Sequence, residues 1–231
     1  MVAGARIFSG APLAANPDEY LLVPLRVHLL SAREVPDVST TLAATDVTRI
    51  LQKINRVWAQ AGLHFYLESL LKEEAAKPDR YPGGQDDGPG LLSLRPDASK
   101  APDVLHVYFI KRMSVNGLYL AGAIFVKDTA SLREVEGGID EPLPRVTSHE
   151  LGHAFGLPHR QNRTNLMASG TTGIWLNEEE ARLVREQARL LPWIESAAAV
   201  KQKAGRLAQA GKTNEARIWY QRLSALEALA K

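Results

Sequence analysis

Residues 149–159 read His-Glu-Leu-Gly-His-Ala-Phe-Gly-Leu-Pro-His, and this stretch decides what the rest of the chain must build. His149 and His153 are four residues apart, so on an α-helix their side chains lie on one face, one turn from each other. Two imidazoles at that spacing can bind one zinc ion at ~2.0–2.1 Å. Glu150 lies about 100° further round the helix, where its carboxylate can reach a water on the metal without being a ligand. The pattern predicts a metal site on a helix with a base beside the metal.

The end of this stretch can supply a third ligand. Gly156 can adopt a left-handed conformation and end the helix, and Pro158 then prevents the helix from resuming. The chain can therefore turn back and bring His159 to the same metal ion. Three protein ligands with one open position are typical of a catalytic zinc site rather than a structural one.

The spacing His-Glu-x-x-His-x-x-Gly-x-x-His of residues 149–159 resembles the signature of the metzincin clan of zinc-dependent metallopeptidases. Members of this clan also carry a methionine-containing Met-turn downstream, and residues 165–170, Asn-Leu-Met-Ala-Ser-Gly, fit it. The resemblance implies that Met167 packs as an apolar floor beneath the three imidazoles. It also implies hydrolysis of peptide bonds by a zinc-bound water that Glu150 activates.

Two residues depart from the patterns of known subfamilies. Arg160 follows the third histidine, where several subfamilies have Glu, Asp, Ser or Pro. Ser169 stands two residues after Met167, where astacin- and serralysin-like members have a tyrosine ligand. The subfamily is therefore unassigned, and no tyrosine from the turn is expected on the metal.

The amino-acid composition limits the classes of protein to which this chain can belong. The chain has 231 residues, of which 45% are hydrophobic and 23% charged, as in an ordinary globular protein. The net charge of +2 gives no case for nucleic-acid binding. No cysteine is present, which excludes disulfides, thiolate zinc ligands and a thiol nucleophile. No apolar run approaches the ~18–20 residues of a membrane span, and nothing indicates an oligomeric state.

We divide the chain into an N-terminal arm (1–19), a metzincin-like catalytic domain (20–192) and a C-terminal helical hairpin (193–231). The resemblance implies an α/β (α+β) zincin fold with a twisted, mixed five-stranded sheet and two long helices, followed by the Met-turn and a C-terminal helix. Hydrophobic periodicity predicts strands at 20–30, 63–68, 103–113 and 122–126. It predicts helices at 40–61, 145–155 and 178–191, and two helices within 194–231 that break at Gly211.

The resemblance also suggests where a peptide would bind. Residues 122–126 are expected to form the edge strand that borders the cleft, so Gly122, Ala123 and Ile124 are candidate substrate-binding residues. The segment after the Met-turn would form the outer wall of the pocket for the residue just after the scissile bond. Ile174 or Trp175 would line that pocket, or would belong to the core.

Residues 78–102 are predicted to form a long loop with carboxylates among glycines at its centre, at 82–90. Such carboxylates can bind Ca²⁺, but their spacing matches no specific calcium loop. A flexible surface loop is the preferred interpretation, and a calcium site is the alternative.

The predicted function is zinc-dependent endopeptidase action on peptides or proteins. The competing hypothesis is a zinc-stabilised, non-catalytic binding module that acts through the sheet edge or the C-terminal hairpin, and a third is zinc hydrolysis of a non-protein amide. The first ten residues lack the sustained apolar stretch of a signal peptide. The resemblance nevertheless favours a secreted or cell-envelope protein whose signal peptide is absent from this sequence, with a cytoplasmic location as the alternative.

Overall fold

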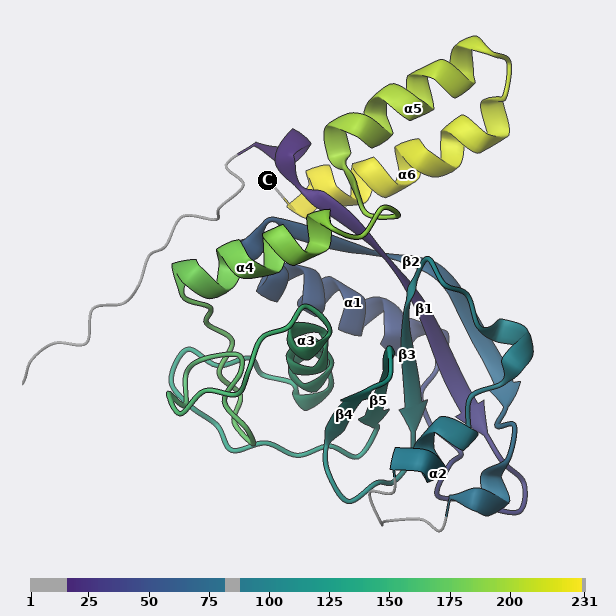
Figure 1. Ribbon diagram of the computed structural model, residues 1–231, viewed down its shortest axis with the longest axis vertical. Helices are drawn as coiled ribbons and strands as arrows, with labels where there is room; N and C mark the ends of the chain where they lie inside the picture. The colour runs from purple at the N-terminus through teal and green to yellow at the C-terminus, as the bar shows by residue number, and fades with distance from the viewer. Residues whose placement is uncertain (1–15, 82–87, 230–231) are drawn as a thin grey trace, which may run out of the picture.

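A computed structural model describes residues 16–81 and 88–229 of the chain (Figure 1). Most of the predicted N-terminal arm lies outside the described residues. So do Asp86 and Asp87, the carboxylates on which the calcium interpretation depended. The division of the chain into three parts stays a prediction.

A mixed sheet forms the centre of the fold, with its strands in the order β2-β1-β3-β5-β4. The neighbours β2, β1, β3 and β5 run parallel, whereas β4 is antiparallel to β5. The short β6 pairs with the start of β1. The strands span Leu21–Ser31 (β1), Leu63–Glu74 (β2), Leu105–Ile110 (β3), Gly117–Leu120 (β4), Ala123–Lys127 (β5) and Glu195–Ser196 (β6).

The expectation that residues 122–126 form the sheet edge is wrong. These residues belong to β5 and its preceding turn, and β5 pairs with β3 on one side and with β4 on the other. Ala123 and Ile124 are accordingly buried, with exposed fractions of 0% and 1%. The edge strand is β4, which begins at Gly117. Four residues with little hydrophobic alternation were too weak a pattern to indicate a strand.

Strand β2 is longer than its sequence indicates. The pattern predicted residues 63–68, but β2 continues to Glu74 because it pairs with β1 along its whole length, with one irregularity at Leu25/Arg26. The added segment, Ser-Leu-Leu-Lys-Glu-Glu, has no strand preference of its own. Pairing with a neighbouring strand decides its conformation here.

Six α-helices surround the sheet within the described residues (Figure 1). The predicted loop at 78–102 contains one of them, α2, which covers the end of the sheet. The helices span Ala44–Trp58 (α1), Gly88–Ser93 (α2), Pro142–Ala154 (α3), Glu178–Arg189 (α4), Ala197–Gln209 (α5) and Thr213–Leu229 (α6). Short 3-10 helices occupy Pro17–Glu19, Ala59–Ala61, Pro78–Arg80 and Asp97–Ser99.

Side-chain alternation along β1 divides its buried residues between the two faces of the sheet. Val23, Leu25 and Val27 belong to the larger core, which also contains buried residues of α1, α3 and α4. Leu22 and Leu30 point to the opposite face, where each joins a separate small cluster. The helix that carries the histidines is therefore held against one face of the sheet.

The C-terminal hairpin packs on the opposite face of the sheet at the start of β1. Helices α5 and α6 contact each other, and β6 joins the hairpin to β1 through hydrogen-bonded pairing. An apolar cluster combines Leu22 with Val200 and Leu223, and Tyr66 of β2 packs against it. None of the described helices is long and apolar enough to cross a membrane.

His64 of β2 makes stability depend on pH. Burial lowers the pKa of His64 from 6.5 to about 4, so the folded protein keeps this ring neutral, while the unfolded chain protonates it near pH 6.5. The contribution of His64 is fully present above pH ~6.5 and is lost as the pH falls toward 4. Between pH 7 and 4.5 we expect a loss of about 2–3 kcal/mol from this residue.

Urea unfolding of wild type and His64→Phe at both pH values measures this effect. The variant should lose about 2–3 kcal/mol less than wild type on acidification, whatever its stability at pH 7. Equal losses in the two proteins would show that His64 titrates normally in the folded state.

Candidate metal centre and active-site cleft

Helix α3 is buried on almost every side, which is why its polar residues can form a site. It begins at Pro142, three residues before the predicted start, and contacts α1 and the strands β4 and β5. Residues 143–152 are all buried. A helix enclosed in this way does not need one apolar stripe, and its charged and polar side chains meet other protein groups rather than water.

The structure brings His149, His153 and His159 together. Their Nε2 atoms are 3.2 Å apart for His149–His153, 3.1 Å for His153–His159 and 3.2 Å for His149–His159. Four ligands arranged as a tetrahedron around zinc at ~2.0–2.1 Å would be ~3.3–3.4 Å apart. The three nitrogens therefore fit three corners of a zinc site. They are the only such group of potential metal ligands in the described parts of the chain.

Backbone carbonyls orient two of the imidazoles. The Nδ1 atom of His149 lies 2.8 Å from the carbonyl oxygen of Leu166, and that of His153 lies 2.8 Å from that of Leu157. A proton on Nδ1 is donated to the carbonyl, which leaves the Nε2 lone pair free for a metal. Burial also lowers the pKa of both rings, so they stay neutral at pH 7.

A left-handed glycine redirects the chain toward the third histidine. Gly156 has φ of 83°, and the N–H of Leu157 donates to the carbonyl of Gly152 across the helix end. The same turn that delivers His159 also places the Leu157 carbonyl on His153. One helix ending thus positions two of the three imidazoles.

Met167 packs against α3 at Gly152. This glycine lies between His149 and His153 in the sequence. Met167 is fully buried, and a Cβ atom on Gly152 would lie 2.5 Å from its sulfur. The Asn165 side chain accepts a hydrogen bond from the Met167 N–H and shapes the turn. Glycine at 152 therefore lets the methionine approach the helix backbone.

Arg160, the residue without a subfamily parallel, links the third histidine to α4. Its Nε donates to Glu180, whose carboxylate also accepts from the Asn165 side chain and from the backbone N–H of Asn177. Asn177 and Glu180 form a capping box at the start of α4. Glu180 thus connects Arg160, which follows the third histidine, with the turn that contains Met167 and with the start of α4.

Glu150 lies beside the histidines and is held by the edge strand. It is 5% exposed, and the backbone N–H of Tyr119 donates to its carboxylate. Burial raises the pKa of Glu150 to about 7, and the Tyr119 N–H and the charge of Arg145 oppose this shift. At Gly117 a Cβ would lie 2.8 Å from Glu150 Oε1, so only glycine lets β4 approach this closely.

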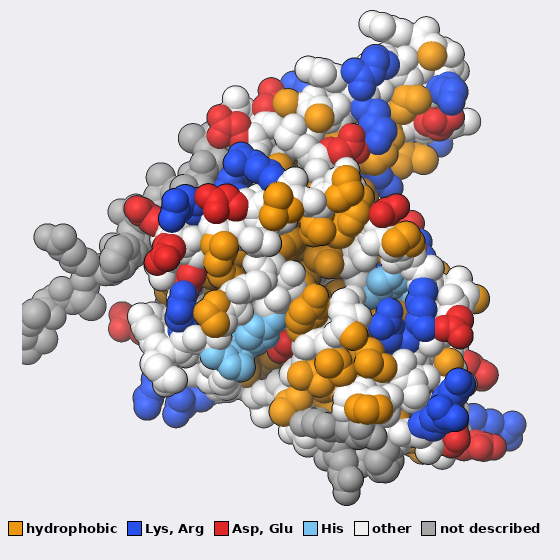
Figure 2. Space-filling view, viewed as in Figure 1, with side chains coloured by type: hydrophobic (Ala, Val, Ile, Leu, Met, Phe, Trp, Pro, Cys, Tyr) orange, Lys and Arg blue, Asp and Glu red, His pale blue; other side chains and the backbone are white. Residues whose placement is uncertain are grey.

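These groups line one cleft with a volume of about 780 Å³. Figure 2 shows histidine side chains reaching the surface with hydrophobic side chains on either side of them. The segment from Ser114 to Tyr119 forms part of its wall, and residues 156–159 form another part. Apolar walls around a few polar groups are typical of a ligand site.

The predicted substrate-binding residues are not brought to this cleft. Ala123 and Ile124 are inside the sheet, and Gly122, Ile174 and Trp175 are not among the lining residues. Trp175 is 39% exposed and packs beside Gly137.

Sequence reasoning missed three groups of the cleft. These are Gly117, the backbone of Tyr119, and Arg145. Arg145 precedes His149 by four residues, so helical spacing alone could have placed it on the same face.

The fold is shared with solved structures of very different sequence. An archaemetzincin from Methanopyrus kandleri has 15% identity and a TM-score of 0.50, with 72% of this chain and 96% of that chain covered. Mirolysin in complex with compound 9 has 10% identity and a TM-score of 0.50, and the match covers 72% of this chain and 91% of the mirolysin chain. No protein-family model and no curated protein matches the sequence. The predicted α/β zincin-like fold is confirmed.

Because Gly152 contacts Met167, we expect its replacement by alanine to change the stability in the opposite direction from that which helix propensity predicts. Gly→Ala in a helix normally stabilises by ~0.5–1 kcal/mol. Gly152→Ala should instead destabilise by about 1–3 kcal/mol, because the new methyl group overlaps the Met167 sulfur. Urea unfolding of the metal-free protein measures the difference.

Gly205 in α5 is the matched control, because a Cβ there would meet no atom within 4 Å. Gly205→Ala should show the normal stabilisation. If both variants are stabilised, Met167 does not pack tightly on α3.

Proposed function

We propose that this chain is a zinc-dependent endopeptidase of the metzincin clan that cleaves peptides or proteins. One observation carries the proposal: three converging Nε2 atoms and a buried carboxylate share one open cleft. His149, His153 and His159 would hold the ion and leave a position open for substrate. Bound zinc supplies Lewis acidity, which acidifies water and polarises a carbonyl group.

Glu150 is proposed as the general base and acid. Burial raises the pKa of this carboxyl group, and a carboxylate that lies beside the metal can take a proton and then release it. It would accept the proton of the attacking water and pass it to the amine nitrogen that leaves. The Tyr119 N–H holds the carboxylate in place, and this hydrogen bond comes from the cleft wall itself.

Strand β4 is proposed as the binding edge for the substrate backbone. It pairs with β5 on one side, and its other edge has no partner strand among the described residues. A peptide can add to such an edge through main-chain hydrogen bonds. Because β4 lies along the wall of the cleft, a bound chain could continue past the metal in both directions, which supports endopeptidase action.

Replacement of the proposed base should remove activity without removing the metal. Glu150→Gln keeps the shape of the side chain but cannot accept the water proton. We expect the cleavage rate of a mixed quenched-peptide library to fall by ~10²–10⁴-fold. Zinc content, measured on the same preparations, should stay at one ion per chain.

A chelator should abolish wild-type cleavage, and added zinc should restore it. Equal cleavage by wild type and Glu150→Gln would rule out Glu150 as the base. Zinc binding by both proteins with cleavage by neither would instead favour the non-catalytic binding module.

Zinc should also stabilise the fold through the three histidines. A ligand that binds only the folded state raises the melting temperature, by an amount equivalent to ~4 kcal/mol at a thousandfold excess over Kd. We expect a zinc-dependent rise in Tm for wild type and its loss in His153→Ala. His64→Phe, which changes a buried histidine outside the cleft, should keep the rise, and loss of the rise in this control would indicate zinc binding elsewhere.

A further inference from the structure

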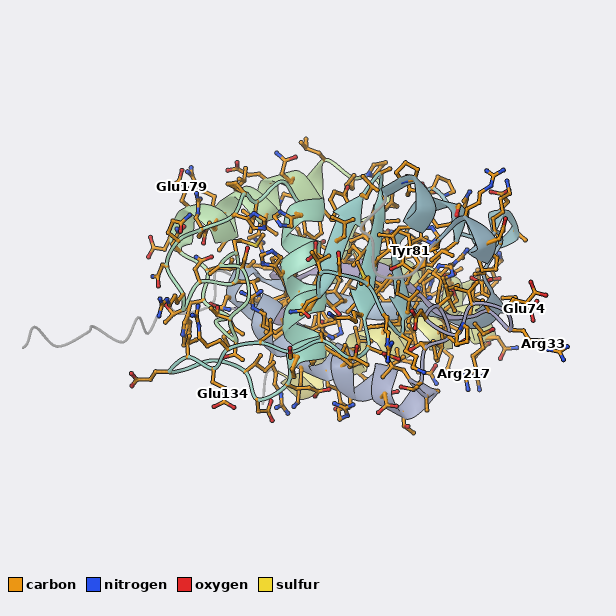
Figure 3. All side chains as sticks on the ribbon, turned by 90° about the horizontal axis from the view of Figure 1, so that it is seen from below. Arg33, Glu74, Tyr81, Glu134, Glu179 and Arg217 are labelled. Carbon is orange, nitrogen blue, oxygen red and sulfur yellow. The ribbon has the colours of Figure 1, made fainter. Side chains whose placement is uncertain are left out.

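Arg145 is a buried cation that lines the active-site cleft. Charged side chains of this protein mostly reach the surface, as Glu74, Glu134 and Glu179 do in Figure 3. Arg145 is only 2% exposed, yet it lines the same cavity as His149 and Glu150. It lies one helical turn before His149, which is a rise of ~6 Å along the axis.

The hydrogen bonds of Arg145 leave one nitrogen unused. Nε donates to the carbonyl of Gly173 at 3.0 Å, and Nη2 donates to the carbonyls of Asn165 and Ala168. Nη1 has no hydrogen-bond partner within the described parts of the chain. Since the other two nitrogens are directed at the 165–173 segment, Nη1 is the one left to face the cavity.

No carboxylate of the described residues forms a salt bridge with this guanidinium. Glu150 is the anion whose charge acts on it, but that carboxylate is held by the Tyr119 N–H. Burial lowers the pKa of Arg145 to about 10, so it remains a cation at neutral pH. A buried cation with a free donor and no ion pair is a favourable place for an incoming anion.

The groups near Arg145 suit a short acidic side chain. Leu132 and Val146 contribute apolar surface to the cavity, and Ser169 and Gly170 add small residues. Apolar walls weaken the competition from water, so a charge-assisted hydrogen bond inside them is stronger than at the surface. Leucine-sized side chains could also enter, but they would leave Nη1 unpaired.

We propose that Arg145 is a specificity-determining residue that binds a carboxylate of the substrate, on a residue next to the scissile bond. This proposal rests on the proposed peptidase function. The carboxylate could belong to an Asp or Glu side chain or to the C-terminus of a short peptide, and both would meet the same guanidinium nitrogen. The test below separates these two sources.

A purely structural role for Arg145 makes a different prediction. The buried Arg185 bonds the carbonyls of Ala61, Gly62 and Glu19 and does not line the cleft, so the chain does use guanidinium groups to tie backbone segments. If Arg145 had only this function, substrate charge would not affect binding or rate.

The experiment uses zinc-loaded wild type and peptides that differ only beside the scissile bond. Glu and Asp peptides are compared with their amide counterparts Gln and Asn, in one set with amidated C-termini and one with free C-termini. In the amidated set we expect kcat/KM to favour the acid over its amide by about 10-fold to 100-fold. Mass spectrometry of the products identifies which neighbour of the bond carries the preference.

Binding gives a readout that does not depend on catalysis. Zinc-loaded Glu150→Gln should bind the acidic peptides more tightly than the amides by a similar factor, measured by fluorescence anisotropy. Acid and amide peptides with equal Kd and equal kcat/KM would overturn the proposal while leaving the peptidase function intact. Binding preference without cleavage by wild type would overturn the proposed function but support carboxylate recognition.

Two variants assign the preference to this site. Arg145→Gln should bring the acid-to-amide ratio close to one, with zinc content confirming that the site is intact. Because Arg145 also holds residues 165–173, Leu132→Glu provides a second variant that places a competing carboxylate in the cavity, and Leu132→Gln is its control. The ratio should collapse in Leu132→Glu and persist in Leu132→Gln.

A preference unchanged in both Arg145→Gln and Leu132→Glu would place charge recognition elsewhere and overturn the proposal. A preference confined to peptides with free C-termini would identify the terminal carboxylate as the group that Arg145 binds. The protein would then act on chain ends rather than within chains.

Discussion

Three imidazole nitrogens must meet within 3.2 Å of one another, and most of the tertiary structure around α3 serves this requirement. Helical spacing brings two of them together, and a left-handed turn at Gly156 brings the third. Correct distance alone is insufficient, because each ring must also present an unprotonated nitrogen. The carbonyls of Leu157 and Leu166, both from the segment that follows α3, orient two of these rings.

The second condition for the site is that neighbouring segments approach α3 closely. Gly152 lets Met167 pack on one side of α3, and Gly117 lets the edge strand reach Glu150 on another. The helix is thereby enclosed between the sheet and the 165–173 segment, which lowers the exposure of Glu150 and raises its pKa. The same enclosure of α3 thus packs the helix and raises the pKa of the Glu150 carboxyl group.

The sheet separates the site from a second cluster of buried polar groups. On the face opposite α3, His28 bonds Glu73 and His106, and His106 bonds the backbone at Ala101. These hydrogen bonds give both histidines a structural role. The C-terminal hairpin covers another part of this face, so neither feature contributes side chains to the cleft.

The sequence by itself determined the three histidines that we propose as metal ligands, the main helices and most strands, because spacing and periodicity are local properties of the chain. It did not determine the edge of the sheet: β5 has the stronger pattern, but pairing places the four-residue β4 outside it. Nor did it reveal that Arg145 and Gly117 belong to the cleft. Their roles arise from groups distant in sequence, such as the Gly173 carbonyl and the Glu150 side chain, and only folding brings these together.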